Sequence, residues 1–110
     1  MEFDEYQTLA RGTAIYPRQG DNYLYPVLGL LGEAGEVAGH VKLVVRDHGG
    51  RMDAAAQRDL RAELGDVLWY LSQTAYELGI SLDEIAEHNL SKLGARQQAG
   101  TLAQDRRKAA

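Results

Sequence analysis

Cysteine is absent from this chain of 110 residues. The protein can therefore form neither disulfide bonds nor the thiolate zinc sites that depend on cysteine. The start of the chain, Met-Glu-Phe-Asp-Glu, has neither the basic residues nor the apolar segment of a secretory signal. Disulfides are rare in the reducing cytoplasm, and a cytoplasmic protein needs no secretory signal. Both observations therefore favour a cytoplasmic protein.

Long apolar runs and an excess of positive charge are also missing. The apolar segments are far too short to span a bilayer, so we expect no membrane partner. The formal net charge of −4 at pH 7 argues against general affinity for DNA or RNA duplexes and for acidic membranes. A nucleotide is still a suitable partner, because local cations and a metal ion can neutralise its phosphates.

Several catalytic signatures are missing as well. The sequence contains no Gly-rich P-loop, no H-E-x-x-H zinc motif and no G-x-S-x-G nucleophile motif. It also contains no Glu-x-x-His, the i,i+3 pair that ferritin-like di-iron bundles use. These absences argue against the enzyme classes that those motifs mark.

What the sequence does contain is helical periodicity, and no stretch alternates like a strand. The pattern predicts four helices, which cover Phe3–Ile15, Pro26–Asp47, the segment between Asp53 and Gly79, and Ser81–Gln98. Pro26 suits a first helical turn, and Gly49 suits the end of the same helix. Asp53 and Ser81 suit N-caps. Short turns between such helices favour an all-α antiparallel bundle.

A single domain of this length buries only a modest core, and each predicted helix has a wide apolar face. We therefore expect oligomerisation to complete the bundle of about four helices. The helical domain is predicted to cover residues 1–98. Residues 99–110 contain Gly100 and the basic run Arg106-Arg107-Lys108, and they are predicted to form a mobile tail.

One short pattern occurs twice: Glu33-Ala34-Gly35-Glu36-Val37 recurs thirty residues later as Glu63-Leu64-Gly65-Asp66-Val67. In each copy the two acids are three residues apart, so they share one helix face, at the edge of the apolar arc. If the two helices pair as arms of a hairpin, four carboxylates meet beside their seam. Repulsion and partial burial would make that arrangement costly without a cation. Oxygen ligands in that number suit Mg²⁺ or Mn²⁺.

The simpler interpretation of these acids is a solvated helix face. The chain has sixteen acidic residues, and an ordinary i,i+3 pair occurs at Glu84 and Glu87. Chance explains less well the glycine that both copies carry between their acids. A mid-helix glycine costs about 1 kcal/mol relative to alanine, so Gly35 and Gly65 indicate close backbone approach or room for a ligand.

Three polar residues share one face of the fourth predicted helix, beside its apolar arc: Asn89, Lys92 and Arg96. An amide and two cations can hold phosphate oxygens. Alternatively, the two cations only complement the helix dipole. His40 lies beside the first acid pair, where an isolated histidine is more often a surface group, or an outer neighbour of a site, than a ligand.

Together these residues resemble the MazG-like all-α nucleoside triphosphate pyrophosphohydrolases. The similarity extends from about Tyr6 to Arg96. It comprises the two acid pairs, the second within Glu-Leu-Gly-Asp-Val-Leu-Trp-Tyr-Leu, and the downstream Asn89-x-x-Lys92. It also includes Thr-Ala-Ile-Tyr-Pro at 13–17 and Leu-Gly-Leu-Leu-Gly at 28–32. The tail departs from the Gly/Asp/Asn-rich ending of close relatives.

The resemblance implies a helical bundle that assembles as a dimer or a dimer-based tetramer. The Mg²⁺ ligands that it implies are the four repeated acids, Glu33, Glu36, Glu63 and Asp66. The implied reaction cleaves a nucleotide between its α and β phosphates and gives a nucleoside monophosphate and pyrophosphate. Asn89 and Lys92 match nucleotide-contacting positions of the family, and Arg96 is a further candidate on the same face.

This chemistry needs no covalent nucleophile. A carboxylate that is not fully engaged with metal can accept the proton of the attacking water, and Glu36 is the first choice, followed by Glu33. A second enzymatic interpretation is a phosphoribosyl-ATP pyrophosphohydrolase, whose bundle and acid motifs are related. A non-enzymatic interpretation is a helical dimer that binds nucleotides or a protein partner and whose acids form only a polar face.

Overall fold

Four helices and no strand make up residues 1–101, the part of the chain that the computed structural model describes. The helices are α1 (Phe3–Arg11), α2 (Leu24–His48), α3 (Ala54–Glu77) and α4 (Leu82–Ala99). The expectation of an all-α fold is confirmed for these residues. Among them, no helix has both the length and the apolar character needed to cross a bilayer. Residues 102–110, most of the predicted tail, lie outside the described part.

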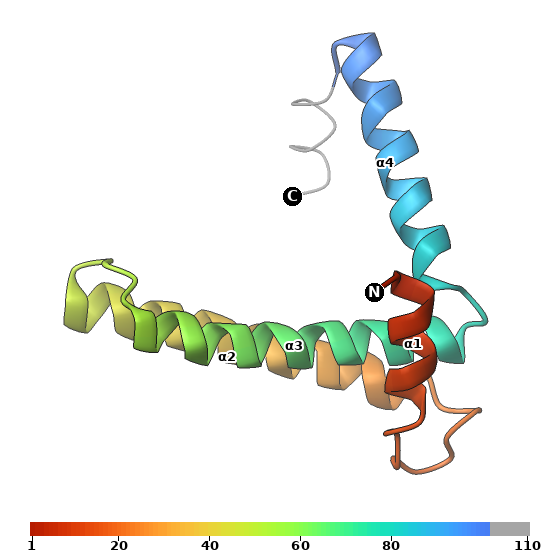
Figure 1. The fold of residues 1–110 in the computed structure, drawn as a ribbon, viewed down its shortest axis with the longest axis horizontal. Helices are drawn as coiled ribbons and strands as arrows, with labels where there is room; N and C mark the ends of the chain where they lie inside the picture. Colours follow the sequence, from red (N-terminus) through yellow and green to blue (C-terminus); the bar gives the residue numbers. More distant parts are fainter. Residues whose placement is uncertain (102–110) are drawn as a thin grey trace.

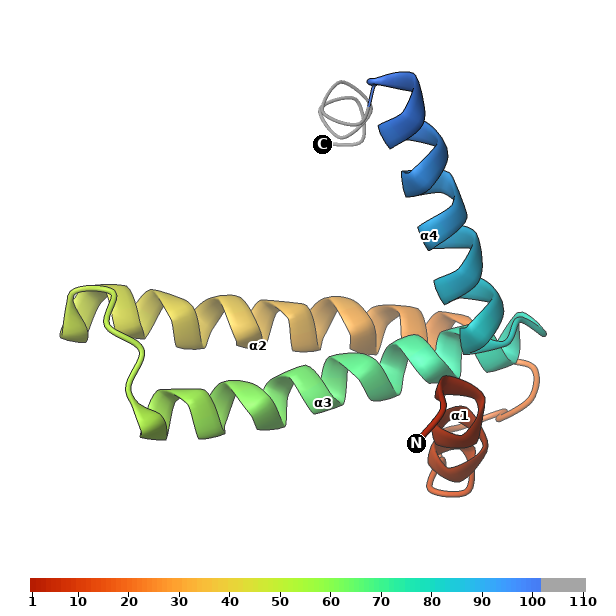
Figure 2. The same ribbon diagram turned by 45° about the horizontal axis from the view of Figure 1, so that its top comes forward.

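The helices α2 and α3 run side by side in opposite directions as a long hairpin, and α1 lies across its open end, against α3 (Figures 1 and 2). Helix α4 begins beside α1 and projects away from the hairpin in both views. One chain therefore supplies an incomplete bundle, because α4 does not lie along the hairpin. Completion of the bundle by oligomerisation stays a prediction.

Side chains of α1 fix the start of α4. The buried Gln7 donates from Nε2 to the carbonyl oxygen of Ile80 at 3.0 Å, and its Oε1 accepts from the backbone N–H of Leu82 at 3.1 Å. Asp4 Oδ1 accepts from the backbone N–H of Asp83 at 3.0 Å. The first N–H groups of a helix have no intrahelical partner. Contacts with α1 therefore satisfy two of these groups and hold the first turn of α4 against α1.

The predicted capping residues are confirmed. Asp53 Oδ1 accepts from the backbone N–H of Ala56 at 2.8 Å, at the start of α3. Ser81 is the N-cap of a reciprocal capping box at the start of α4. Pro26 lies in the first turn of α2, and Gly49 follows the end of that helix in the left-handed conformation, with φ of 61°.

The first helix is shorter than predicted, because it ends at Arg11 and not at Ile15. The backbone N–H and the hydroxyl of Thr13 both donate to the carbonyl oxygen of Ala10, at 3.0 and 2.7 Å, and close a turn. Trp69 Nε1 on α3 donates to the same hydroxyl at 2.8 Å. Helix α1 therefore ends in a turn closed by Thr13, and a hydrogen bond from α3 holds that turn.

The seam between α2 and α3 uses positions three or four residues apart on each helix, as expected for one face of each. Its buried and half-buried positions include Leu30, Glu33, Val37, His40 and Val44 on α2, and Leu60, Glu63, Val67 and Tyr70 on α3. Each acid pair is therefore divided. Glu33 and Glu63 stand between apolar seam residues, whereas Glu36 and Asp66 are exposed at the rim.

Gly29 lets the aromatic ring of Tyr70 lie against the backbone of α2. A Cβ added at Gly29 would stand 2.1 Å from the nearest atom of that ring. At Gly35 and Gly65, by contrast, an added Cβ would meet no atom within 4 Å. Close backbone approach was expected at Gly35 and Gly65, and for contacts within a single chain this expectation is wrong. The alternative, that these glycines leave room for a ligand, stays a prediction.

We expect Gly29→Ala to destabilise the fold, because the Tyr70 ring or the helix must move. Overpacking of this kind costs about 1–3 kcal/mol, of which the helix propensity of alanine offsets up to about 1 kcal/mol. Gly32→Ala is a matched control on the same helix, since its Cβ would meet no atom within 4 Å. Urea unfolding followed by circular dichroism tests the prediction. A midpoint for Gly29→Ala at or above that of Gly32→Ala would contradict it.

A buried ion pair ties α1 and the following loop to the end of α3. Arg11 Nη2 lies 3.6 Å from Glu77 Oε1, and the two side chains are 13% and 1% exposed. The hydroxyl of Tyr16 and the backbone N–H of Gly20 donate to the same carboxylate oxygen, at 2.5 and 2.9 Å. Arg11 Nη1 also donates to Tyr16 and to Gln73 Oε1, at 2.6 and 2.9 Å. This network holds α1 and the loop before α2 against the end of α3.

Candidate metal centre

The four repeated acids come together between the arms of the hairpin, in two overlapping groups. One group contains Glu33, Glu63 and Asp66, and the other contains Glu36, His40 and Glu63. Within each group, one potential ligand atom per residue lies within 4.8 Å of the others. Glu63 belongs to both groups. We call the four carboxylates the acid cluster; the structure brings them together, and their role as ligands stays a prediction.

The acid cluster is electrostatically unfavourable by itself. Burial raises the pKa of Glu33, and a hydrogen bond with Glu63 and the charges of Asp66, Glu63 and Glu36 raise it further. A carboxyl group whose pKa is raised by folding stabilises the protein at low pH, and this stability is lost as the pH rises through the folded-state pKa. A divalent cation would offset the repulsion, and carboxylate oxygens are the donors that Mg²⁺ and Mn²⁺ prefer. The donor set therefore fits such an ion.

His40 lies one helical turn after Glu36 and belongs to the seam. Its Nε2 is 3.4 Å from Glu63 Oε1, and the two side chains are 33% and 22% exposed. The sequence pattern favoured a surface group or an outer neighbour of the site. The structure places His40 half-buried and in contact with Glu63, as an outer neighbour of the site would be, and also within a group of potential ligands.

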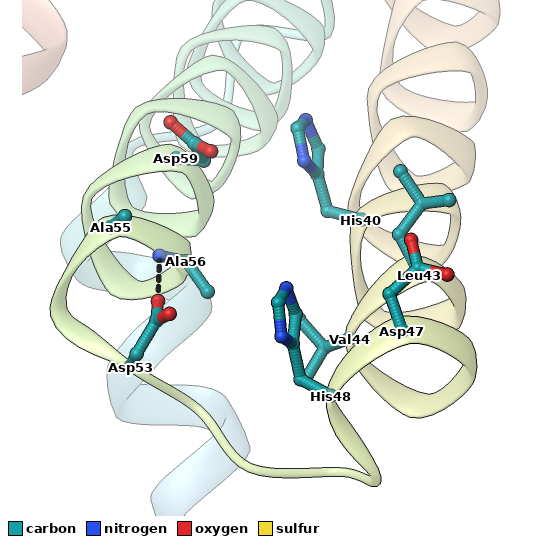
Figure 3. Close-up of a pocket in the computed structure, with 9 residues that line it drawn as sticks. All are labelled: His40, Leu43, Val44, Asp47, His48, Asp53, Ala55, Ala56 and Asp59. Carbon is teal, nitrogen blue, oxygen red and sulfur yellow. Dashed lines mark hydrogen bonds between the residues drawn. The ribbon is translucent and has the colours of Figure 1, made fainter.

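Beyond His40, the hairpin has a cavity of about 240 Å³ near its tip. Figure 3 shows the imidazoles of His40 and His48 on the α2 side of this cavity and the carboxylate of Asp59 on the α3 side. Asp53, whose carboxylate caps α3, lines the far end. His40 therefore contacts the acid cluster and also lines this polar cavity.

Two tyrosines border the acid cluster. Burial raises the pKa of Tyr6 on α1, and the charge of Asp66 raises it further. Burial also raises the pKa of Tyr70 on α3, with additional contributions from Tyr25, Glu33 and Asp66. Phenols with a raised pKa stay protonated at neutral pH. Both hydroxyls can therefore donate hydrogen bonds beside the cluster.

The structure does not bring the predicted phosphate-binding residues to the acid cluster. Asn89 and Lys92 are exposed on α4, where they line an open groove with His88. Arg96 is half-buried one turn further along. Because α4 projects away from the hairpin, these residues lie apart from the cluster of their own chain (Figures 1 and 2). Their contact with a substrate stays a prediction.

Two features of the structure were not predicted from the sequence. One is the ion pair of Arg11 and Glu77, for which a signal existed: an acid in the last turn of a helix opposes the helix dipole and needs a compensating cation. The other is the seam position of His40. Counting from Glu33 in steps of four and three leads through Val37 to His40, so the periodicity could have identified it.

A family model for the MazG nucleotide pyrophosphohydrolase domain matches residues 23–101, which is most of the chain. The chain belongs to the MazG nucleotide pyrophosphohydrolase family. The matched range of this MazG domain includes α2, α3 and α4, and with them the whole acid cluster. The resemblance inferred from the sequence motifs is thus confirmed.

The MazG domain is also similar to the Gene 37 protein of Mycobacterium phage L5. The two are 43% identical over 107 residues, which cover 93% of this chain and 94% of the phage protein. No solved structure matches the chain.

Proposed function

We propose that this MazG protein is a Mg²⁺-dependent pyrophosphohydrolase that cleaves an NTP or dNTP between the α and β phosphates. The products are a nucleoside monophosphate and pyrophosphate. The observation that carries the proposal is the acid cluster, in which carboxylates from both arms of the hairpin converge on one place. Membership of the MazG family supports the reaction class.

The acid cluster would hold the metal ion, with Mn²⁺ as the alternative to Mg²⁺. The raised pKa of Glu33 supports this role, because burial, and then the neighbouring carboxylates, disfavour its charged form when no cation is present. When bound, the ion would neutralise phosphate oxygens and orient the triphosphate for in-line attack. The bound metal ion then offsets the electrostatic repulsion between the carboxylates.

Glu36 is proposed to accept the proton of the attacking water, with Glu33 as the second candidate. Glu36 lies outside the all-carboxylate group of Glu33, Glu63 and Asp66, and it is exposed at the rim, where water reaches it. The water oxygen bonds to phosphorus while the bond between phosphorus and the α–β bridging oxygen breaks. The proton passes to the carboxylate, and no covalent nucleophile is needed.

We further propose that a second copy of the chain completes the site. Large apolar side chains are exposed along α2, at Leu24, Leu28, Leu31, Val41 and Val45. Burial of such a face favours association. In a dimer or tetramer, α4 of one chain could reach the acid cluster of another, where Asn89, Lys92 and Arg96 would hold phosphate oxygens. A monomeric mass by light scattering would contradict this part of the proposal.

A substrate panel tests the reaction. The purified full chain is incubated with each common and damaged NTP and dNTP, with Mg²⁺ or with a chelator, and the products are separated by anion exchange. We expect monophosphate and pyrophosphate in equal amounts, and only with metal. A folded protein that turns over no nucleotide, or that yields a diphosphate and orthophosphate, would contradict the proposal.

The same panel separates the alternatives. Phosphoribosyl-ATP belongs in it, because a phosphoribosyl-ATP pyrophosphohydrolase would prefer that substrate to ordinary nucleotides. A helical dimer that only binds nucleotides or a protein would show binding without turnover of any member of the panel.

A further inference from the structure

Two potential metal-binding groups are found among residues 1–101, and one of them, Glu36, His40 and Glu63, contains a nitrogen donor, the imidazole of His40. The other candidates in both groups are carboxylates. We propose that Glu36, His40 and Glu63 form a second cation position, which prefers first-row transition metals such as Mn²⁺ and Co²⁺ to Mg²⁺. The proposal deepens the function proposed above, and it rests on the same acid cluster.

The spacing of the three residues suits a common ion. Glu36 and His40 are one turn apart on α2, and ligands at i and i+4 share one helix face, as they do in helical zinc motifs. Glu63 approaches from α3, with its Oε1 3.4 Å from His40 Nε2. Ligand atoms about 2.1 Å from a metal stand at most about 4.2 Å apart. The potential ligand atoms lie within 4.8 Å of one another, so a small rotation of the side chains brings them to the separations that a bound ion requires.

The imidazole is available for a metal. Within residues 1–101, its contact with Glu63 does not have hydrogen-bond geometry, and no other polar contact of His40 is found. The ring also lines the 240 Å³ cavity near the hairpin tip, which offers room for the water molecules that complete a coordination shell (Figure 3).

The donor types set the expected preference. Imidazole nitrogen binds later first-row metals well, whereas Mg²⁺ is held mainly by oxygen. The group of Glu33, Glu63 and Asp66 contains oxygen donors only. The two positions should therefore differ in metal preference although they share Glu63. A carboxylate can bind through one oxygen, so Glu36 can be a ligand here and keep its second oxygen for the attacking water.

Pulsed electron paramagnetic resonance of bound Mn²⁺ tests the proposal without reference to turnover. Imidazole coordination gives a ¹⁴N modulation of the spin echo. We expect this modulation in the wild-type full chain and in His48→Gln, and its loss in His40→Gln. His48 is a matched control, because it lines the same cavity but belongs to neither group of ligands. Circular dichroism checks that each variant keeps its helices.

Calorimetric titration gives the second readout. His40→Gln should lower the affinity for one equivalent of Mn²⁺ or Co²⁺ by at least about tenfold. The affinity for Mg²⁺ should change far less. Absence of ¹⁴N modulation in wild type, or its survival in His40→Gln, would overturn the proposal even if the enzyme hydrolyses nucleotides with Mg²⁺. Failure of the wild type to bind any divalent cation would overturn both this proposal and the proposed function.

Discussion

Glu63→Gln should abolish both metal binding and turnover. Glu63 belongs to both groups of potential ligands, so its loss affects every proposed cation position at once. Removal of a residue that only orients a ligand typically lowers metal affinity or activity by about 10–100-fold, and we expect loss of this shared ligand to exceed about 100-fold. Asp66→Asn should have a smaller effect, because Asp66 belongs to one group and is exposed.

Although Glu63→Gln should lose metal binding, it should make the metal-free protein slightly more stable. Glu63→Gln removes one negative charge from the acid cluster, so the folded state without metal is expected to gain a few tenths of a kcal/mol from reduced repulsion. Thermal unfolding with and without Mg²⁺ measures both effects, since wild type should be stabilised by the ion and the variant should not.

The exposed Glu5 on α1 provides a control of the same charge change. Glu5→Gln should leave metal affinity and turnover as in wild type. If Glu63→Gln also kept wild-type metal affinity, the acids would be a polar face only, as the non-enzymatic interpretation holds.

Arg11→Met should cost about 3 kcal/mol of stability at neutral pH. The carboxylate of Glu77 is almost completely buried, and removing its cation leaves a charge without its partner. The expected loss of stability is at the low end for a broken buried ion pair, because Tyr16 and Gly20 still donate to that carboxylate. For a small domain this is a large part of the total free energy of unfolding. Urea unfolding at neutral pH measures it.

Acid pH should reduce the effect of Arg11→Met. Burial alone would raise the pKa of Glu77, but hydrogen bonds from Tyr16, Gly20 and Asn22 and the charge of Arg11 bring it below its usual value. A carboxyl group with a lowered pKa stabilises the fold above its unfolded-state pKa of about 4.3, and this contribution is lost as the pH falls through the folded-state pKa. The free energies of unfolding of wild type and Arg11→Met should therefore differ less near pH 3 than near pH 7.

A double variant isolates the ion pair. Arg11→Met combined with Glu77→Gln removes the unpaired charge, so it should be more stable than Arg11→Met alone. Equal stability of the single and double variants, or a wild-type midpoint for Arg11→Met, would show that the pair does not stabilise the packing of α1 against α3.

The position of most helix ends follows from local sequence, and the structure shows why those predictions succeed. Asp53 and Ser81 cap the helices that follow them, because a cap needs only backbone groups two or three residues away. The end of α1 was misplaced for the opposite reason. Thr13 is held in a turn by Trp69, which is far away in the sequence, and no local pattern contains that contact.

The sequence by itself determined that the chain is helical and that two acid pairs lie on helices able to meet. Helical period and capping depend on neighbours within about one turn, and these are visible in the chain. The glycines show the limit of that information. Close packing occurs at Gly29 and not at Gly35 or Gly65, because it depends on the Tyr70 ring of another helix.

Only the tertiary structure decided how each helix is rotated about its axis and where α4 points. Rotation of the hairpin arms put Glu33 and Glu63 in the seam and left Glu36 and Asp66 at the rim. Hydrogen bonds from Gln7 at the other end of the chain hold the residues on either side of Ser81 against α1. These outcomes depend on contacts between residues far apart in sequence, whose free energies act only once the helices are packed.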